Sequence, residues 1–210
     1  CAIWYMATHQ APAPVGPITA ATTTPTTGTA AEPQQIVDNG KYYEITATYP
    51  GSTLLRQTTS PQADAAAVAT LKTFVEQQIA RFKDNGNFEN LSAQDIELQG
   101  LDAGRKYAFS AEYKTYQGAH TVSYVYTLYE DTLGAHPNAY YRTFTFDTAT
   151  GQDVELSDLF ASGNYLETLS TIARADLPNI IRAKTGSAAD TDYISNGTPP
   201  EADSFQNWYL

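Results

Sequence analysis

A sustained alternation of apolar and polar residues in the middle of the chain constrains its fold more than any other feature. The alternation runs through residues 107–113, 122–128 and 141–146, and a turn at Gln117 and Gly118 separates the first two runs. Successive side chains of a β-strand point to opposite faces of a sheet, so this period of two predicts strands with one buried face. Three such strands joined by short turns predict an antiparallel meander.

Two segments with helical spacing flank the meander. The first starts at Pro61, directly after Ser60 in the N-cap position, and stops at Gly86. The second covers residues 164–182 and contains Pro178, which we expect to bend its last turns. The apolar stripe of the first helix is Val68, Leu71, Val75, Ile79 and Phe82, and that of the second is Leu166, Leu169, Ile172, Ala173, Leu177 and Ile180.

Two shorter elements complete the expected architecture, a strand at residues 41–49 and a turn of helix at residues 156–160. The order of elements predicts an α+β fold of two small sub-domains, in which an antiparallel sheet carries helices on one face. The predicted regions are an anchor remnant at residues 1–10, a tether at 11–38, an N-terminal strand-helix sub-domain at 39–104 and a C-terminal meander-plus-helix sub-domain at 105–210. Because the chain stops on the aromatic run 203–210, we expect that the C-terminal sub-domain is truncated and lacks at least one strand.

The N-terminal residues indicate attachment to a membrane. Cys1 could be the lipid-modified first residue of a lipoprotein, or residues 2–6 could be the outer end of a truncated membrane helix, with Trp4 and Tyr5 at the headgroup level. A fragment boundary inside a soluble protein is the third interpretation. Residues 11–31 contain four prolines, seven threonines and no charge, so they cannot bury enough surface to fold and are expected to form a spacer.

The acidic composition excludes some classes of partner. The chain has 12 basic and 23 acidic residues and a net charge of -11, so its surface repels phosphate backbones and anionic headgroups and attracts cationic proteins. We therefore expect no nucleic-acid partner, and membrane contact only through the N-terminal anchor. The single cysteine precludes an internal disulfide and a cysteine-based metal site within this chain.

The sequence contains no recognisable motif for catalysis or cofactor binding. It has no glycine-rich phosphate loop, no paired-cysteine metal motif and no nucleophile-elbow pentapeptide. Its three histidines, His9, His120 and His136, do not have the spacing of metal ligands. We therefore predict no catalytic residue, no metal site and no cofactor in this chain.

Five short motifs follow one another in the second half of the chain. They are Tyr-Val-Tyr, Gly-Ala-His-Pro-Asn, Phe-Thr-Phe-Asp, Thr-Gly and Leu-Ser-Asp-Leu-Phe, starting at Tyr124, Gly134, Phe144, Thr150 and Leu156. In order and spacing these motifs resemble a bacterial family of domains of unknown function, and the resemblance covers residues 41–210. The chain departs from the family pattern at Leu133, where the family loop often has a second glycine.

The resemblance implies a place in the bacterial cell envelope, at the outer face of the cytoplasmic membrane. Relatives in this family include the extracytoplasmic domain of a lysozyme-sensing anti-sigma factor and the non-catalytic domain of a membrane-anchored peptidoglycan deacetylase. The partners that it implies are a cationic wall-associated protein such as lysozyme, or the glycan of peptidoglycan.

The Gly-Ala-His-Pro-Asn loop contains the first group of candidate site residues. Gly134 permits a positive φ and Pro137 fixes the exit of the loop, so both are expected to have a structural role. Gly151 is expected to have a similar role in the turn that follows the meander. His136 and Asn138 either lock the loop through hydrogen bonds or contact a ligand.

The tyrosines of the meander form the second group of candidate site residues. Tyr124, Tyr126 and Tyr140 lie near the acidic residues Glu130 and Asp131 in the sequence. Aromatic faces stack on ligands and acidic groups attract cations, so these tyrosines could form a recognition face. Packing of half-buried strand residues explains the same row.

The sequence therefore favours a non-enzymatic binding or sensing module of a membrane-anchored envelope protein. A first alternative is the accessory, non-catalytic domain of a peptidoglycan deacetylase whose catalytic domain lies outside this chain. A second alternative is a structural envelope lipoprotein.

Overall fold

The computed structural model of the chain describes residues 33–51, 61–161 and 163–210. These residues fall into two compact units, one within Thr29–Asp153 and the other including Val154–Leu210. We call the first the sheet unit and the second the helical unit. The predicted anchor, including Cys1, and the tether up to residue 32 lie outside the described residues.

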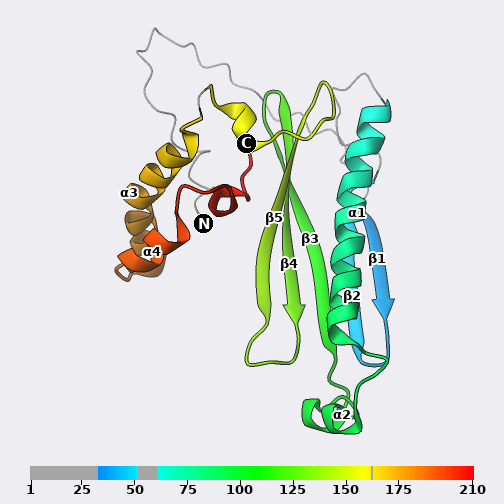
Figure 1. Cartoon of the computed structure of the whole chain (residues 1–210). Helices are drawn as coiled ribbons and strands as arrows, with labels where there is room; N and C mark the ends of the chain where they lie inside the picture. The colour runs from blue at the N-terminus through cyan, green and yellow to red at the C-terminus, as the bar shows by residue number, and fades with distance from the viewer. Residues whose placement is uncertain (1–32, 52–60, 162) are drawn as a thin grey trace. The chain divides into compact units, whose positions relative to one another are not determined.

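The sheet unit contains one five-stranded sheet (Figure 1). Its strands, in spatial and sequence order, are β1 (Gln34–Asn39), β2 (Tyr43–Tyr49), β3 (Tyr107–Gln117), β4 (Thr121–Asp131) and β5 (Asn138–Asp147). Neighbouring strands are antiparallel except for β2 and β3, which are parallel. The predicted α+β class and the meander from β3 to β5 are confirmed, and the sheet is mostly antiparallel.

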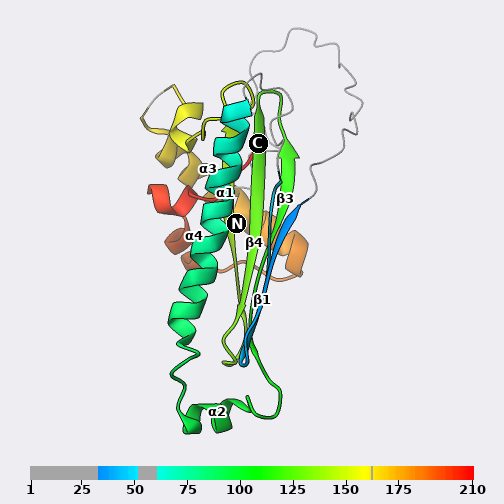
Figure 2. The same ribbon diagram turned by 90° about the vertical axis from the view of Figure 1, so that its right-hand side faces the viewer.

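Helix α1 (Pro61–Gly86) runs along one face of this sheet, as Figures 1 and 2 both show. A short helix, α2 (Ala93–Gln99), follows beyond the end of the sheet where α1 stops. The parallel pairing of β2 and β3 requires a long crossover connection, and the segment with α1 and α2 provides it.

The strand boundaries change two of the predicted regions. Strand β1 begins at Gln34, inside the segment 11–38 that the sequence predicts as tether, because Ile36 and Val37 provide a short β-compatible run that pairs with β2. The predicted boundary between residues 104 and 105 falls inside the sheet unit, since β2 and β3 pair across it. The structure divides after Asp153 instead.

The core of the sheet unit lies between α1 and the sheet. The buried side of α1 consists of Ala67, Leu71, Val75, Ile79 and Phe82, so four of the five predicted positions are buried and Ala67 takes the place of Val68. Opposite them, the sheet contributes Ile45, Ala47, Phe109, Ala111, Val122, Tyr124, Tyr126, Leu128 and Phe146. This face of the sheet therefore provides the larger apolar surface, and burial of that surface is the main stabilising contribution to the unit.

The helical unit has a small core of its own. It consists of η2 (Leu156–Leu159), α3 (Tyr165–Thr185), α4 (Thr191–Gly197) and η3 (Ala202–Phe205). The buried residues are Leu169, Ala173, Leu177, Ile194 and Phe205. The predicted turn of helix and second helix are confirmed, and α3 ends at Gly186, whose φ of 73° is the left-handed conformation that favours glycine.

None of the helices in the described ranges is both long enough and apolar enough to cross a membrane.

Candidate functional site

Two of the tyrosines predicted as recognition residues are core residues. Tyr124 is 2% exposed and Tyr126 is 0% exposed, because both side chains are on the face of β4 that α1 covers. The edge of the Phe74 ring on α1 meets the Tyr126 ring at a centroid distance of 5.4 Å. Neither tyrosine can contact a ligand in this conformation, so the packing interpretation holds for both.

Tyr140 has a different environment from the other two tyrosines. It is half-buried at the start of β5, and Arg81 on α1 donates a hydrogen bond to its hydroxyl. The guanidinium also lies over the Tyr140 ring, 5.5 Å from its centroid, and 4.0 Å from a carboxylate oxygen of Glu130. Tyr140 is thus held by neighbours on two elements, with part of its surface exposed.

The loop between β4 and β5 is exposed throughout the segment that contains His136. Nδ1 of His136 lies 3.2 Å from the carbonyl oxygen of Pro137, and both His136 and Asn138 are exposed. Asn138 pairs with Glu130 at the first position of β5. Among residues 33–51, 61–161 and 163–210, no further contact locks the His136 ring, so ligand contact by His136 and Asn138 stays a prediction.

The positive φ in this loop is at Leu133, whose φ is 60°, and Gly134 is not among the residues with positive φ. The expectation for Gly134 is therefore wrong by one residue. The backbone N–H of Leu133 donates to Oδ1 of Asp131 over 2.8 Å, and Leu133 itself is the residue in the left-handed region. Leu133 occupies the position where the resembled family often has glycine, which adopts that conformation without strain.

We expect the substitution Leu133→Gly to stabilise the sheet unit by about 0.5–1 kcal/mol. A non-glycine residue in the left-handed region costs about 1–2 kcal/mol, and the greater chain entropy of glycine offsets about half of the gain. Equilibrium unfolding in urea measures the difference. Leu133→Ala retains the strain and is the matched control, so equal stabilisation by both substitutions would contradict this explanation.

A hollow that the sequence did not reveal lies where α1 ends. It is lined by Tyr43 of β2, by Lys83 and Asp84 of α1, and by Asn87, Phe88, Glu89 and Asn90 of the following turn, and its volume is about 380 Å³. We call it the α1 hollow. The end of α1, whose residues line the hollow, lies at the same end of the sheet unit as the β4–β5 loop (Figure 1).

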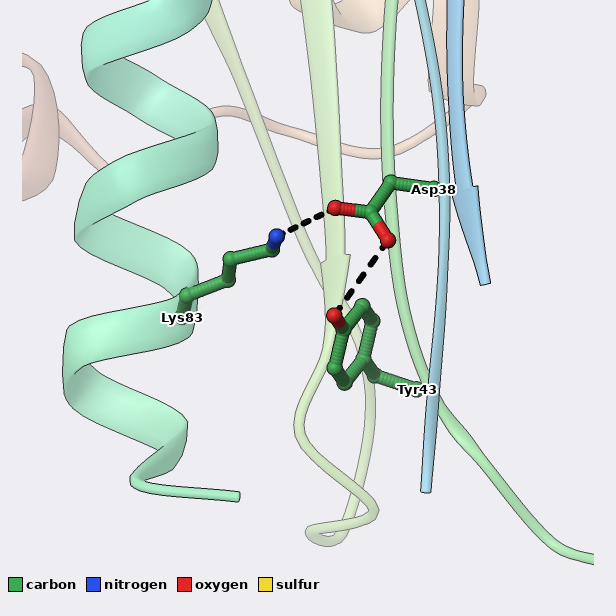
Figure 3. A network of polar contacts seen from close by, with 3 residues as sticks. All are labelled: Asp38, Tyr43 and Lys83. Atoms are coloured by element: carbon green, nitrogen blue, oxygen red, sulfur yellow. Dashed lines mark hydrogen bonds and ion pairs between the residues drawn. The ribbon is translucent and has the colours of Figure 1, made fainter. Parts of the chain in front are cut away.

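Three residues from three elements form a polar network beside the α1 hollow (Figure 3). Lys83 on α1 donates to Oδ2 of Asp38 on β1, and the hydroxyl of Tyr43 on β2 donates to Oδ1 of the same carboxylate over 3.3 Å. The hydrogen bond between Lys83 and Asp38 lowers the pKa of the Asp38 carboxyl and raises the pKa of the Lys83 ammonium. Both groups are therefore charged at neutral pH, and the ammonium is held 5.3 Å above the Tyr43 ring.

Two aromatic rings form the apolar part of the α1 hollow. The rings of Tyr43 and Phe88 lie 4.8 Å apart, and Phe88 also contacts Phe82 and Tyr107 at centroid distances of 5.4 and 5.1 Å. Phe88 is half-buried, so its ring connects the core of the unit to the surface.

Each of these two rings occupies space next to a glycine. A Cβ at Gly86 would lie 2.1 Å from the Phe88 ring, and a Cβ at Gly40 would lie 2.3 Å from the Tyr43 ring. Any side chain at either position would displace the neighbouring ring. The turn itself is formed by Asn87, which has a φ of 43°, because asparagine tolerates the left-handed conformation at a helix end.

The charges around the α1 hollow are predominantly negative. Asp84 and Glu89 contribute two carboxylates, and neither forms an ion pair within the described ranges of the chain. The ammonium of Lys83 is already paired with Asp38. The amides of Asn87 and Asn90 lie beside these groups and are joined by a hydrogen bond of 2.7 Å.

One feature of the sequence indicates this hollow. Residues 85–90 read Asn-Gly-Asn-Phe-Glu-Asn, and Asn85 and Gly86 predict the end of a helix. An aromatic residue between three asparagines, directly after an amphipathic helix, also indicates a polar turn with an exposed ring.

No group of three or more histidine, cysteine or acidic residues in the described part of the chain could hold a metal ion.

No family model matches the chain. The peptidoglycan-N-acetylmuramic acid deacetylase PdaC of Bacillus subtilis (strain 168) is 23% identical to it over 177 residues, which are 83% of this chain and 33% of that protein. The chain thus spans 33% of the length of this curated relative. The match agrees with the expected resemblance to a peptidoglycan deacetylase.

The structural comparison found partial similarity to two solved structures. A DUF3298 family protein from Pseudomonas aeruginosa PAO1 has 15% identity and a TM-score of 0.42, and the alignment covers 73% of this chain and 68% of that one. A DUF3298 family member from Bacteroides fragilis NCTC 9343 has 15% identity and a TM-score of 0.49, with 77% and 71% covered.

Proposed function

We propose that the chain is a non-catalytic accessory module of a cell-envelope protein and that it binds the glycan of peptidoglycan. The observation that supports this proposal is the match of 83% of the chain to 33% of a peptidoglycan deacetylase. A module that accounts for a third of such an enzyme is suited to hold it on its polymeric substrate, because binding of a second site on the same polymer raises the effective concentration of the substrate. An N-terminal anchor, at Cys1 or residues 2–6, would keep the module at the outer face of the membrane.

We expect the full 210-residue chain to sediment with insoluble peptidoglycan sacculi and to remain in solution with cellulose. Both polymers offer pyranose rings, but only peptidoglycan contains amino sugars and peptides, so cellulose is the control for non-specific stacking. The measurement is the fraction of protein in the pellet over a range of sacculus concentrations. Protein that stays in the supernatant with sacculi, or that sediments equally with cellulose, would show that the proposed function is wrong.

The net charge of -11 supports a second candidate function, the binding of a cationic wall-associated protein such as lysozyme. Electrostatic steering of this kind weakens as salt screens the charges, with a Debye length of about 8 Å at physiological ionic strength. Immobilised lysozyme distinguishes the two functions. If the chain is a sensing module, lysozyme should bind it in the absence of glycan, and the association rate should fall as the salt concentration rises. Binding to neither sacculi nor lysozyme would leave the structural envelope lipoprotein.

A further inference from the structure

We propose that the α1 hollow binds one uncharged or cationic pyranose unit of a glycan strand; this inference rests on the proposed function and assigns it a site. The hollow is a concave site of about 380 Å³, within the range of roughly 300–1,000 Å³ that is usual for small-molecule sites.

The chemistry of the α1 hollow matches a sugar ring. One face of a pyranose presents C–H groups, which stack on aromatic rings, and its edge presents hydroxyls that both donate and accept hydrogen bonds. The rings of Tyr43 and Phe88 supply the apolar surface. Asn90 supplies an amide oxygen as acceptor and one N–H donor, since its other N–H bonds to Asn87. The carboxylates of Asp84 and Glu89 accept from hydroxyls, and charge-assisted hydrogen bonds of this type are the stronger ones.

The charge of the α1 hollow selects among sugars. Asp84 and Glu89 are not paired by cations within the described ranges, and Lys83 is paired with Asp38. A carboxylate-bearing sugar would be repelled by this surface, whereas an N-acetylated neutral sugar or a de-N-acetylated sugar with an ammonium group would not. The site therefore favours the N-acetylglucosamine unit of a peptidoglycan strand over the muramic acid unit, whose lactyl group carries a peptide with carboxyl groups.

The α1 hollow is also held in shape before any ligand arrives. The Tyr43 ring is fixed by the hydrogen bond of its hydroxyl to Asp38, by the Lys83 ammonium above it and by the space at Gly40. Phe88 is fixed by three aromatic neighbours. A site that is already ordered loses less side-chain entropy when it binds, which raises its affinity.

The test is a calorimetric titration of the full chain with two probes, a tetramer of N-acetylglucosamine and a tetramer of glucosamine. The exposed residue Asn90 is replaced in the variant Asn90→Asp, which retains the shape of the side chain but removes both N–H donors and adds a negative charge. We expect this variant to bind the neutral tetramer about tenfold more weakly, which corresponds to about 1.4 kcal/mol, close to the loss of one hydrogen bond. The variant Gly86→Ala, which displaces the Phe88 ring, is expected to weaken binding of both tetramers.

The matched control is Asn179→Asp, the same substitution at an exposed asparagine of α3. Unchanged affinity in this control and weaker binding in Asn90→Asp would support the α1 hollow as the site. Weaker binding in Asn138→Asp, at the predicted contact residue that begins β5, with unchanged binding in Asn90→Asp would place the site near the β4–β5 loop and overturn this inference. Wild-type affinity in both Asn90→Asp and Gly86→Ala would also overturn it, even if the unmodified chain still sediments with sacculi and the proposed function stands.

The two probes identify which sugar unit the α1 hollow takes. Preference for the glucosamine tetramer, lost in the variant Asp84→Asn and retained in Glu112→Gln on strand β3, would support a de-N-acetylated unit. Preference for the N-acetylated tetramer would support the neutral unit. If neither tetramer binds while sacculi do, the inference about the site fails and the proposed function survives; if sacculi do not bind either, both fail.

Discussion

Replacing Tyr126 with phenylalanine is expected to leave the sheet unit at least as stable as the wild type, whereas Tyr126→Ala is expected to cost about 3–5 kcal/mol. Tyr126 is fully buried, and its ring contacts Phe74, Tyr113 and Phe144. Its hydroxyl has no hydrogen-bond partner among the described residues. The ring therefore stabilises the core and the hydroxyl does not, because a buried hydroxyl without a partner loses its hydrogen bonds to water and forms none within the protein.

Urea unfolding of the three proteins, followed by the near-ultraviolet circular dichroism of the tyrosines, measures both differences. The comparison separates the ring from the hydroxyl, since phenylalanine retains the first and removes only the second. A loss of about 1 kcal/mol or more in Tyr126→Phe would contradict the prediction and would mean that the hydroxyl is hydrogen-bonded in solution.

The same burial predicts how the stability of the sheet unit depends on alkaline pH. Burial raises the pKa of Tyr126 and of Tyr124 above the usual value for tyrosine, about 10. In the unfolded chain these phenols ionise near pH 10, but in the folded unit they stay protonated. Their contribution to stability is therefore complete below about pH 10 and is lost above it, by about 1.4 kcal/mol per pH unit for each group. In Tyr126→Phe only Tyr124 contributes, so the free energy of unfolding should fall less steeply with pH above about pH 10 than in the wild type.

The second large effect is expected at Gly151, where Gly151→Ala should destabilise the sheet unit by about 2–4 kcal/mol. Gly151 has a φ of 69°, and a Cβ there would lie 2.6 Å from the Cβ of Ala63 and 2.9 Å from its carbonyl oxygen. Two costs therefore add, the strain of a left-handed alanine and a clash with the backbone of α1. The backbone of α1 at Ala63 cannot move away from the added Cβ as a flexible side chain could.

The turn before Gly151 cannot relax easily either. Oδ1 of Asp147 accepts from the backbone N–H groups of Ala149 and Thr150 over 2.9 and 2.7 Å, and from the Thr150 hydroxyl over 3.0 Å. These bonds, that of the Thr150 N–H above all, lower the pKa of Asp147. The turn is therefore held as one piece, and a shift at Gly151 disturbs the whole of it.

Alanine substitutions at two other glycines separate the conformational cost at Gly151 from the cost of the clash with α1. Gly104 has a φ of 93° with nothing within 4 Å of a Cβ. Gly104→Ala should therefore show the conformational cost alone, about 0.5–1 kcal/mol once the lower chain entropy of alanine is taken into account. Gly134 has neither a positive φ nor a close neighbour, since the nearest atom would be 3.8 Å away, so Gly134→Ala should change little. Equal effects in Gly151→Ala and Gly104→Ala would rule out the contact with α1 as a cause.

The elements that the sequence predicted well are those with a long and regular apolar period. The stripe of α1 and the alternation of β3, β4 and β5 each extend over six residues or more, so the pattern outweighs local propensity. Strand β1 and helices α2 and α4, with six or seven residues each, were missed. Strand β2 is equally short but was predicted, because its β-branched and aromatic residues alternate without a break.

The candidate site was harder to predict than the fold, because its residues are assembled from distant segments. Alternation shows that Tyr124 and Tyr126 share a face, but it does not show which face α1 covers. The α1 hollow joins Tyr43 and the turn after α1, more than 40 residues further along the chain. Its two glycines look like ordinary turn residues until the neighbouring rings are seen.

The sequence by itself determined the α+β class, the meander, the two long helices and the negative charge, because each depends on local period or on composition. The tertiary structure alone decided that β2 and β3 pair in parallel and that the unit boundary follows Asp153. It also decided that Tyr124 and Tyr126 are core residues while Tyr140 stays partly exposed. It also decided where rings, amides and carboxylates gather into a hollow. These features depend on which segments come together in space, and that is set by the burial of one shared apolar surface between α1 and the sheet.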